Sequence, residues 1–106
     1  MSWRPKHKYG AKRCEAEGIK FDSQLERDYF YRLKRLQQAG QVVFFLRQVP
    51  LYLPGNIRYV VDFVEFLADE TVRFVDVKGY DTPLSKLKRK QAEAVYPIEI
   101  EVVKKV

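Results

Sequence analysis

The feature that most restricts the fold is the segment 57–67, which is rich in β-forming residues and apolar on both strand faces. Such a run is typical of a central strand covered on both sides. Two further β-rich runs flank it, at 42–53 and 71–78, and the connections between them are short turn-forming segments. Short connections favour antiparallel neighbours, so we expect an antiparallel meander with residues 57–67 in its middle. Pro50 interrupts the first run and predicts a bulge or a sheet edge.

A helix is predicted before the meander. Ser23 and Glu26 form a capping-box pattern ahead of an apolar stripe with helical spacing, and Gly40 supplies a stop. These signals predict a helix over 23–39. Short extended pieces within 12–21 predict a small hairpin. Residues 1–12 are basic, contain aromatic residues and lack apolar periodicity, so we expect an arm.

A second helix is predicted after the meander, with Thr82 as its N-cap and Pro83 at its first position. It runs to about residue 95, and one stripe of it carries Leu84, Leu87, Gln91 and Val95. An alternating segment, 98–103, then predicts a last strand that returns through a helical crossover. The order α-β-β-β-α-β indicates an α/β fold of α+β character with a mixed central sheet flanked by helices. No linker divides the chain, so we expect a single domain over 1–106.

The charge and the cysteine content restrict the classes of function that suit this chain. The 20 Lys and Arg residues exceed the 14 Asp and Glu residues, which gives a net charge of +6 and indicates a polyanionic partner. One cysteine, Cys14, forms neither an internal disulfide nor a cysteine-rich zinc site. We see no secretory signal and no apolar run long enough to span a bilayer, so we expect a cytoplasmic protein without a membrane partner.

Two carboxylates lie inside apolar strand runs, where an ionised side chain is costly without a partner. Asp62 is in the middle run, and Asp76 is in the third run, two residues before Lys78 on the same strand face. The turn length decides whether the two acids meet. A two-residue loop sets Asp62 opposite Val77, whereas a three-residue loop at 68–70, or a bulge, sets it opposite Asp76.

Two converging carboxylates with a backbone carbonyl between them suit a hard divalent cation, Mg²⁺ or Mn²⁺. Such a cation assists phosphodiester hydrolysis, and a lysine beside it orients water or neutralises charge on the phosphate. Glu26 is a possible third acid, although its position equally suits a role in the capping box. Taken singly, Asp62 is equally well explained as a partner of Arg58 or Arg73, and the Asp76–Lys78 pair as an ordinary strand-end charge pair.

The element order, together with Glu26, Asp62 and the Asp76-Val77-Lys78 motif, resembles the PD-(D/E)XK nuclease superfamily. Segments 9–12, 18–26, 59–64 and 76–79 are similar to a family of small nuclease-like proteins common in bacteriophages and prophages. The resemblance implies a restriction-endonuclease-like fold and a Mg²⁺- or Mn²⁺-dependent deoxyribonuclease. It implies an endonuclease acting on branched, Holliday-junction-like or non-specific DNA. It also implies a homodimer in the cytoplasm of a bacterial host, encoded by a phage or prophage.

By position, the resemblance casts Asp62 and Asp76 as metal ligands, with the backbone carbonyl of Val77 as a further ligand. Lys78 becomes the lysine that positions water or stabilises charge, and Glu26 the accessory acid, binding directly or through water. The sequence departs from the pattern in having Val61 before the first acid and Asp76 in place of glutamate. Gln91 and Tyr96 are one residue too far apart for a pattern found in some exonuclease members.

Basic residues near the two ends are predicted to contact DNA phosphates. They are Lys12, Arg13, Lys86, Lys88, Arg89 and Lys90. Two other functions stay open: a non-catalytic nucleic-acid-binding module that retains the nuclease fold, and a structural phage component.

Overall fold

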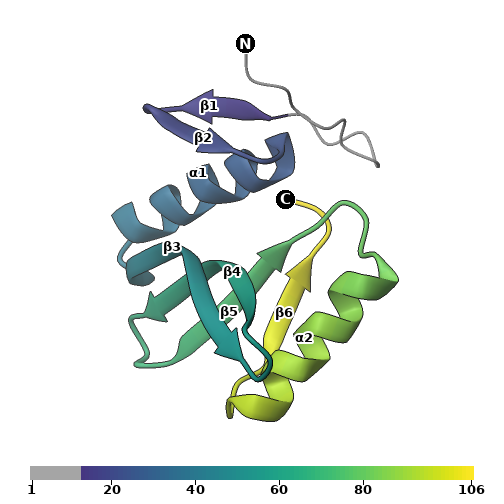
Figure 1. Cartoon of the computed structure of the whole chain (residues 1–106). Coiled ribbons are helices and arrows are strands. Elements are labelled where there is room, and N and C mark those ends of the chain that lie inside the picture. The colour runs from purple at the N-terminus through teal and green to yellow at the C-terminus, as the bar shows by residue number, and fades with distance from the viewer. Residues whose placement is uncertain (1–12) are drawn as a thin grey trace.

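The predicted meander forms the centre of the molecule in the computed structural model, which describes residues 13–106 (Figure 1). The four-stranded sheet has the order β3-β4-β5-β6, in which β5 and β6 are parallel and the other pairs are antiparallel. A separate two-stranded hairpin lies outside this sheet. The elements are β1 (Cys14–Ala16), β2 (Ile19–Phe21), α1 (Gln24–Gln38), β3 (Val42–Leu53), β4 (Ile57–Leu67), β5 (Val72–Val77), α2 (Pro83–Val95) and β6 (Ile100–Val103).

The architecture is therefore a small α+β domain with a mixed four-stranded sheet and two helices. β4 occupies an interior position, as its two apolar faces predict, and β3 is an edge strand, as Pro50 predicts. Pro50 pairs in register with Val60, and the register shift in this pair of strands lies between Val42 and Phe44. The predicted arm at 1–12 lies outside the described residues.

Helix α1 begins where the capping pattern predicts. The side chain of Ser23 accepts a hydrogen bond from the backbone N–H of Glu26 at 3.1 Å, which satisfies one of the free amides of the first turn. The helix buries Tyr29, Phe30 and Leu33 against the sheet and the hairpin. This contact fixes α1, and with it Glu26, over one sheet face.

Replacing Ser23 with alanine should lower the free energy of unfolding by about 1 kcal/mol, because the first turn loses its side-chain acceptor. Urea denaturation of the two proteins measures this difference. Ser85→Ala is the matched control, because Ser85 lies in the first turn of α2, where Thr82 supplies the cap. Equal losses in the two variants would contradict a capping role for Ser23.

Helix α2 packs differently from the way its apolar stripe indicates. Thr82 caps it as predicted, and Ala92 is its buried contact with the sheet. The stripe residues Leu84 and Leu87 are 60% and 54% exposed. The small Ala92 side chain allows α2 to lie close to the sheet, so the stripe is turned away from the core.

The two helices cover opposite faces of the sheet, because neighbouring strand residues point to opposite faces. Phe63 belongs to the core cluster under α1 and the hairpin, and Val64 to the cluster that contains Ala92 of α2. In Figure 1 the purple hairpin lies beyond α1, and α2 lies beside β6. Within residues 13–106, no helix is long and apolar enough to cross a membrane.

Candidate active site at the bend of the central strand

The turn between β4 and β5 has the length that brings the two strand aspartates together. Phe63 pairs with Val75, and continuing this register by one residue sets Asp62 opposite Asp76. The connection is the three-residue loop at 68–70, closed by a hydrogen bond from the Leu67 amide to the Thr71 carbonyl. Glu70 adopts the left-handed conformation, with φ 71°, that such loops require at their last position. The alternative two-residue register is therefore wrong.

Two backbone N–H groups, those of Asp62 and Val77, join the side chains of Asp62 and Asp76 to the neighbouring strand. The backbone N–H of Asp62 donates to Oδ1 of Asp76 at 3.1 Å, and the N–H of Val77 donates to Oδ2 of Asp62 at 2.9 Å. The regular β4–β5 ladder ends at Phe63 and Val75, so these two bonds continue the pairing with side chains. The other oxygen of Asp76, Oδ2, accepts a hydrogen bond from the Tyr59 hydroxyl. The two acids are thus held side by side, with Asp76 buried and Asp62 half-buried.

The regular alternation of side chains along β4 is broken at Asp62. Val61 packs with the α2 cluster, whereas Phe63, two residues later, packs with the α1 cluster. A regular strand would place both on one face. The alternation of the neighbouring strand β3 is broken at the matching position, because Phe45 packs with the α1 cluster and Val49 with the α2 cluster. The hairpin of β3 and β4 therefore bends in both strands at one level.

The bend in β3 is centred on Gln48, which has a φ of 52°. A left-handed conformation in a residue other than glycine costs of order 1–3 kcal/mol, so the surrounding contacts must hold it. The ladder between β3 and β4 has no pair at Gln48 and Asp62, although the pairs on both sides share one register. The two strands thus separate where Asp62 lies.

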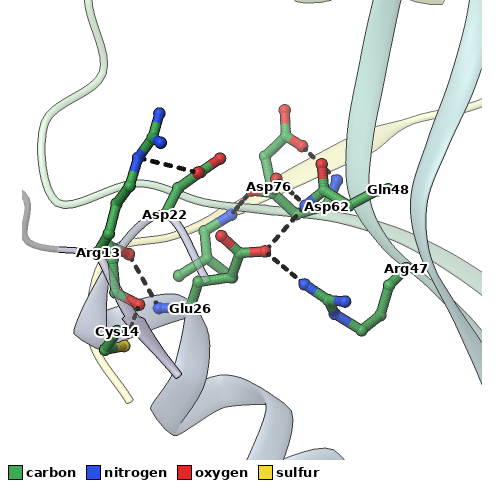
Figure 2. A network of polar contacts seen from close by, with 10 residues as sticks. Arg13, Cys14, Asp22, Glu26, Arg47, Gln48, Asp62 and Asp76 are labelled. Atoms are coloured by element: carbon green, nitrogen blue, oxygen red, sulfur yellow. Dashed lines mark hydrogen bonds and ion pairs between the residues drawn. The ribbon is translucent and has the colours of Figure 1, made fainter. Parts of the chain in front are cut away.

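Glu26 reaches this bend from α1 (Figure 2). The residue is 3% exposed, and its Oε1 accepts a hydrogen bond from Nε2 of Gln48 at 2.9 Å. The same nitrogen lies 3.3 Å from Oδ1 of Asp62, so one amide links two of the predicted acids. The guanidinium of Arg47 lies 3.5 Å from the same Oε1. The Glu26 backbone N–H donates to the Ser23 cap while its carboxylate faces the cluster, so the metal role of Glu26 stays a prediction.

The charges of the cluster act on one another. Burial, followed by the charges of Asp76 and Glu26, raises the pKa of Asp62 to about 7. The Val77 amide and the Lys78 ammonium oppose this rise in the pKa. Burial and the charge of Asp22 also raise the pKa of Glu26.

The donor chemistry of the cluster fits a hard divalent cation, because three carboxylates and the Val77 carbonyl are oxygen ligands of the kind Mg²⁺ and Mn²⁺ prefer. The ligand set is not assembled, however. Within residues 13–106, no group of three His, Cys, Asp or Glu side chains has the spacing of a metal site. The carboxylates are bonded to Gln48, Tyr59 and backbone amides instead.

The alternative pairing of Asp62 with an arginine is not what the contacts show. Arg73 binds Glu101 at 2.6 Å and lies 3.5 Å from Glu65, a fourth acid buried in β4. Glu65 also accepts a hydrogen bond from the Tyr29 hydroxyl at 2.5 Å. Glu65 is therefore held by its own partners under α1, whereas Asp62 is bonded to Gln48 and Val77.

The basic residues predicted to contact DNA have different surroundings. Lys86 and Lys90 of α2 are exposed, and Lys88 is half-buried. The Arg89 guanidinium binds both oxygens of Asp81, at 3.2 and 2.5 Å, and is only 13% exposed, so it holds the start of α2. Arg13 is exposed and lies 3.9 Å from Asp22. Lys12 lies outside the described residues.

Sequence reasoning missed Arg47, Gln48 and Tyr59, which contact the acids directly. Arg47 lies over the Phe21 ring at 4.5 Å, and its buried Nε has no hydrogen-bond partner. No sequence signal identifies these residues, because Arg47 and Gln48 are consecutive in an ordinary β-rich run. Only the bend directs both toward Glu26.

The fold and site define a small α+β domain with an acidic cluster at the bend of its sheet. The chain belongs to the family described as "Protein of unknown function (DUF1064)", which it matches over residues 6–105. Searches of curated proteins and of solved structures find no match.

Proposed function

We propose that this protein is a Mg²⁺- or Mn²⁺-dependent endonuclease of the PD-(D/E)XK type, with a restriction-endonuclease-like fold, that hydrolyses DNA. One observation carries the proposal. Asp62 lies beside Asp76, the Gln48 amide links Glu26 to Asp62, and Lys78 directly follows Val77, whose amide binds Asp62. These residues come from α1, β4 and the end of β5, the positions that the superfamily resemblance implies.

The residues of the cluster have separable tasks in this reaction. Asp62, Asp76 and the Val77 carbonyl would hold the cation, with Glu26 joining directly or through water. When bound, the cation supplies a water of lowered pKa and stabilises negative charge on the phosphoryl and leaving oxygens. Lys78 orients the attacking water or offsets charge on the phosphate. Tyr59 fixes the orientation of Asp76 by donating to its Oδ2.

Phosphate binding is assigned to the exposed cations. Lys86 and Lys90 lie on α2, which follows Lys78 after a short loop, so they can contact the DNA backbone beyond the cleaved bond. Branched DNA, with two strands to be cut by a homodimer, and non-specific duplex both fit this arrangement. The proposed location is the cytoplasm of a bacterial host of a phage or prophage.

A non-catalytic nucleic-acid-binding module is the second candidate. The observation in its favour is that the carboxylates of Glu26, Asp62 and Asp76 are bonded within the protein, and residues 13–106 hold no ready metal site. Such a module gains little from acids that face phosphate, because they repel it. The two functions differ in one measurable product, cut DNA.

The test incubates the purified protein with linear, supercoiled, single-stranded and four-way-junction DNA in EDTA, Mg²⁺ or Mn²⁺. We expect cleavage of at least one substrate with Mg²⁺ or Mn²⁺, none in EDTA, and loss of cleavage in Asp76→Asn. Glu99→Gln is the matched control, because Glu99 is an exposed acid outside the cluster. Salt-dependent binding without cleavage in Mn²⁺ would select the binding module instead.

A further inference from the structure

Arg47 and Gln48 are consecutive residues of β3 that bind the same carboxylate oxygen. Both contact Oε1 of Glu26, at 3.5 and 2.9 Å. In a regular strand their side chains would point to opposite faces. The left-handed backbone of Gln48, with φ 52°, rotates the chain and allows both side chains to reach one point. The unusual backbone and the shared contact therefore belong to one arrangement.

The Gln48 amide occupies a particular place in the cluster. Its Nε2 donates to Glu26 at 2.9 Å and lies within hydrogen-bond distance of Asp62 at 3.3 Å, so it lies between carboxylates of α1 and β4. These two elements have no backbone pairing, and Gln48 is itself missing from the β3–β4 ladder. An N–H donor between two carboxylates keeps their oxygens close despite their mutual repulsion.

We propose that Gln48 is a positioning residue that holds Glu26 and Asp62 together so that one divalent cation can bind to both. This inference rests on the proposed function. The amide bridges the two carboxylates. Glu26 and Asp62 would hold the cation, and Gln48 would keep both ligands and the bend of β3 in place. Residues that orient metal ligands in this way typically change metal affinity 10- to 100-fold when they are removed.

The test separates the effect of the Gln48 side-chain amide from the effect of the left-handed backbone at this residue. Gln48→Gly removes the side chain and relaxes the left-handed backbone, whereas Gln48→Ala removes the amide and keeps the unfavourable φ. Isothermal titration measures Mn²⁺ affinity, and thermal denaturation measures stability. We expect at least tenfold weaker Mn²⁺ binding in both variants. We also expect Gln48→Gly to be the more stable of the two. Weaker Mn²⁺ binding in both variants then cannot be explained by a loss of stability.

Two variants serve as matched controls. Asn56→Gly relaxes another left-handed residue, with φ 59°, in the turn between β3 and β4. Gln37→Ala removes a glutamine whose side-chain amide donates to the Val43 carbonyl. Both should bind Mn²⁺ like the parent protein.

The outcomes distinguish this inference from the proposed function. If the parent binds Mn²⁺ and Gln48→Gly binds it equally well, the Gln48 inference is overturned and the proposed function stands. If the parent binds no Mn²⁺, the proposed function fails, and the inference fails with it. If only Gln48→Ala loses affinity, the cause is the backbone conformation, and the positioning role of the amide is wrong.

Discussion

Asp62→Asn should reduce Mg²⁺-dependent DNA cleavage by at least about 10³-fold, which corresponds to a loss of about 4 kcal/mol of transition-state stabilisation. The amide oxygen of asparagine still accepts the Val77 N–H that now binds Oδ2 of Asp62, so the strand pairing is retained. The substitution removes a negative charge from the point where the cation would bind. Cleavage rates of the substrate cut by the parent protein measure the effect.

Asp69→Asn is the matched control for this experiment. Asp69 lies in the 68–70 loop of the same hairpin, is exposed, and accepts hydrogen bonds from Thr71 that asparagine can also accept. The control should cleave like the parent. Parental activity in Asp62→Asn would show that Asp62 is not part of the catalytic centre.

The same substitution should make the protein more stable at pH 8. The pKa of Asp62 is raised from 3.8 to about 7 in the folded state, so the unfolded chain releases this proton at lower pH than the folded protein does. Between these two values, the free energy of unfolding of the parent falls as pH rises, by up to about 4 kcal/mol for this one group. Asparagine does not ionise, so the free energy of unfolding of Asp62→Asn does not fall in this way.

Urea denaturation at pH 4, 5.5, 7 and 8, without divalent cations, measures the effect. The stability difference between Asp62→Asn and the parent should grow across this range and reach about 2–4 kcal/mol at pH 8. Parallel pH profiles for the two proteins would show that burial and the neighbouring carboxylates do not raise the pKa of Asp62. Together with the activity loss, a gain in stability would mean that the cluster is retained at a cost in stability.

Much of the fold follows from local patterns. Ser23 and Thr82 cap the two helices, and the short turns force the antiparallel order of β3, β4 and β5. These features depend on residues close in sequence, and local hydrogen bonding largely decides them. The stripe of Leu84 and Leu87 was misleading as a guide to packing, because the small Ala92 contacts the sheet instead.

The site was only partly predictable. Two aspartates in apolar strand runs are unusual, so the sequence identifies them as candidate site residues. Whether their side chains lie together depends on the length of the loop between β4 and β5. The roles of Gln48 and Arg47 had no sequence signal, since they depend on a bend that breaks strand alternation. The links from Glu26 to Asp62 and from Tyr59 to Asp76 likewise depend on long-range packing.

Local sequence patterns account for the elements, their order and the identity of the acids, because propensity, capping and turn chemistry act over a few residues. Long-range packing sets which of these acids share one electrostatic environment. That outcome depends on the register of β4 and β5 and on the left-handed residue in β3, which together bring α1 and two strands to one point. Burial and charge at that point then raise the pKa of Asp62, a property that no single segment carries.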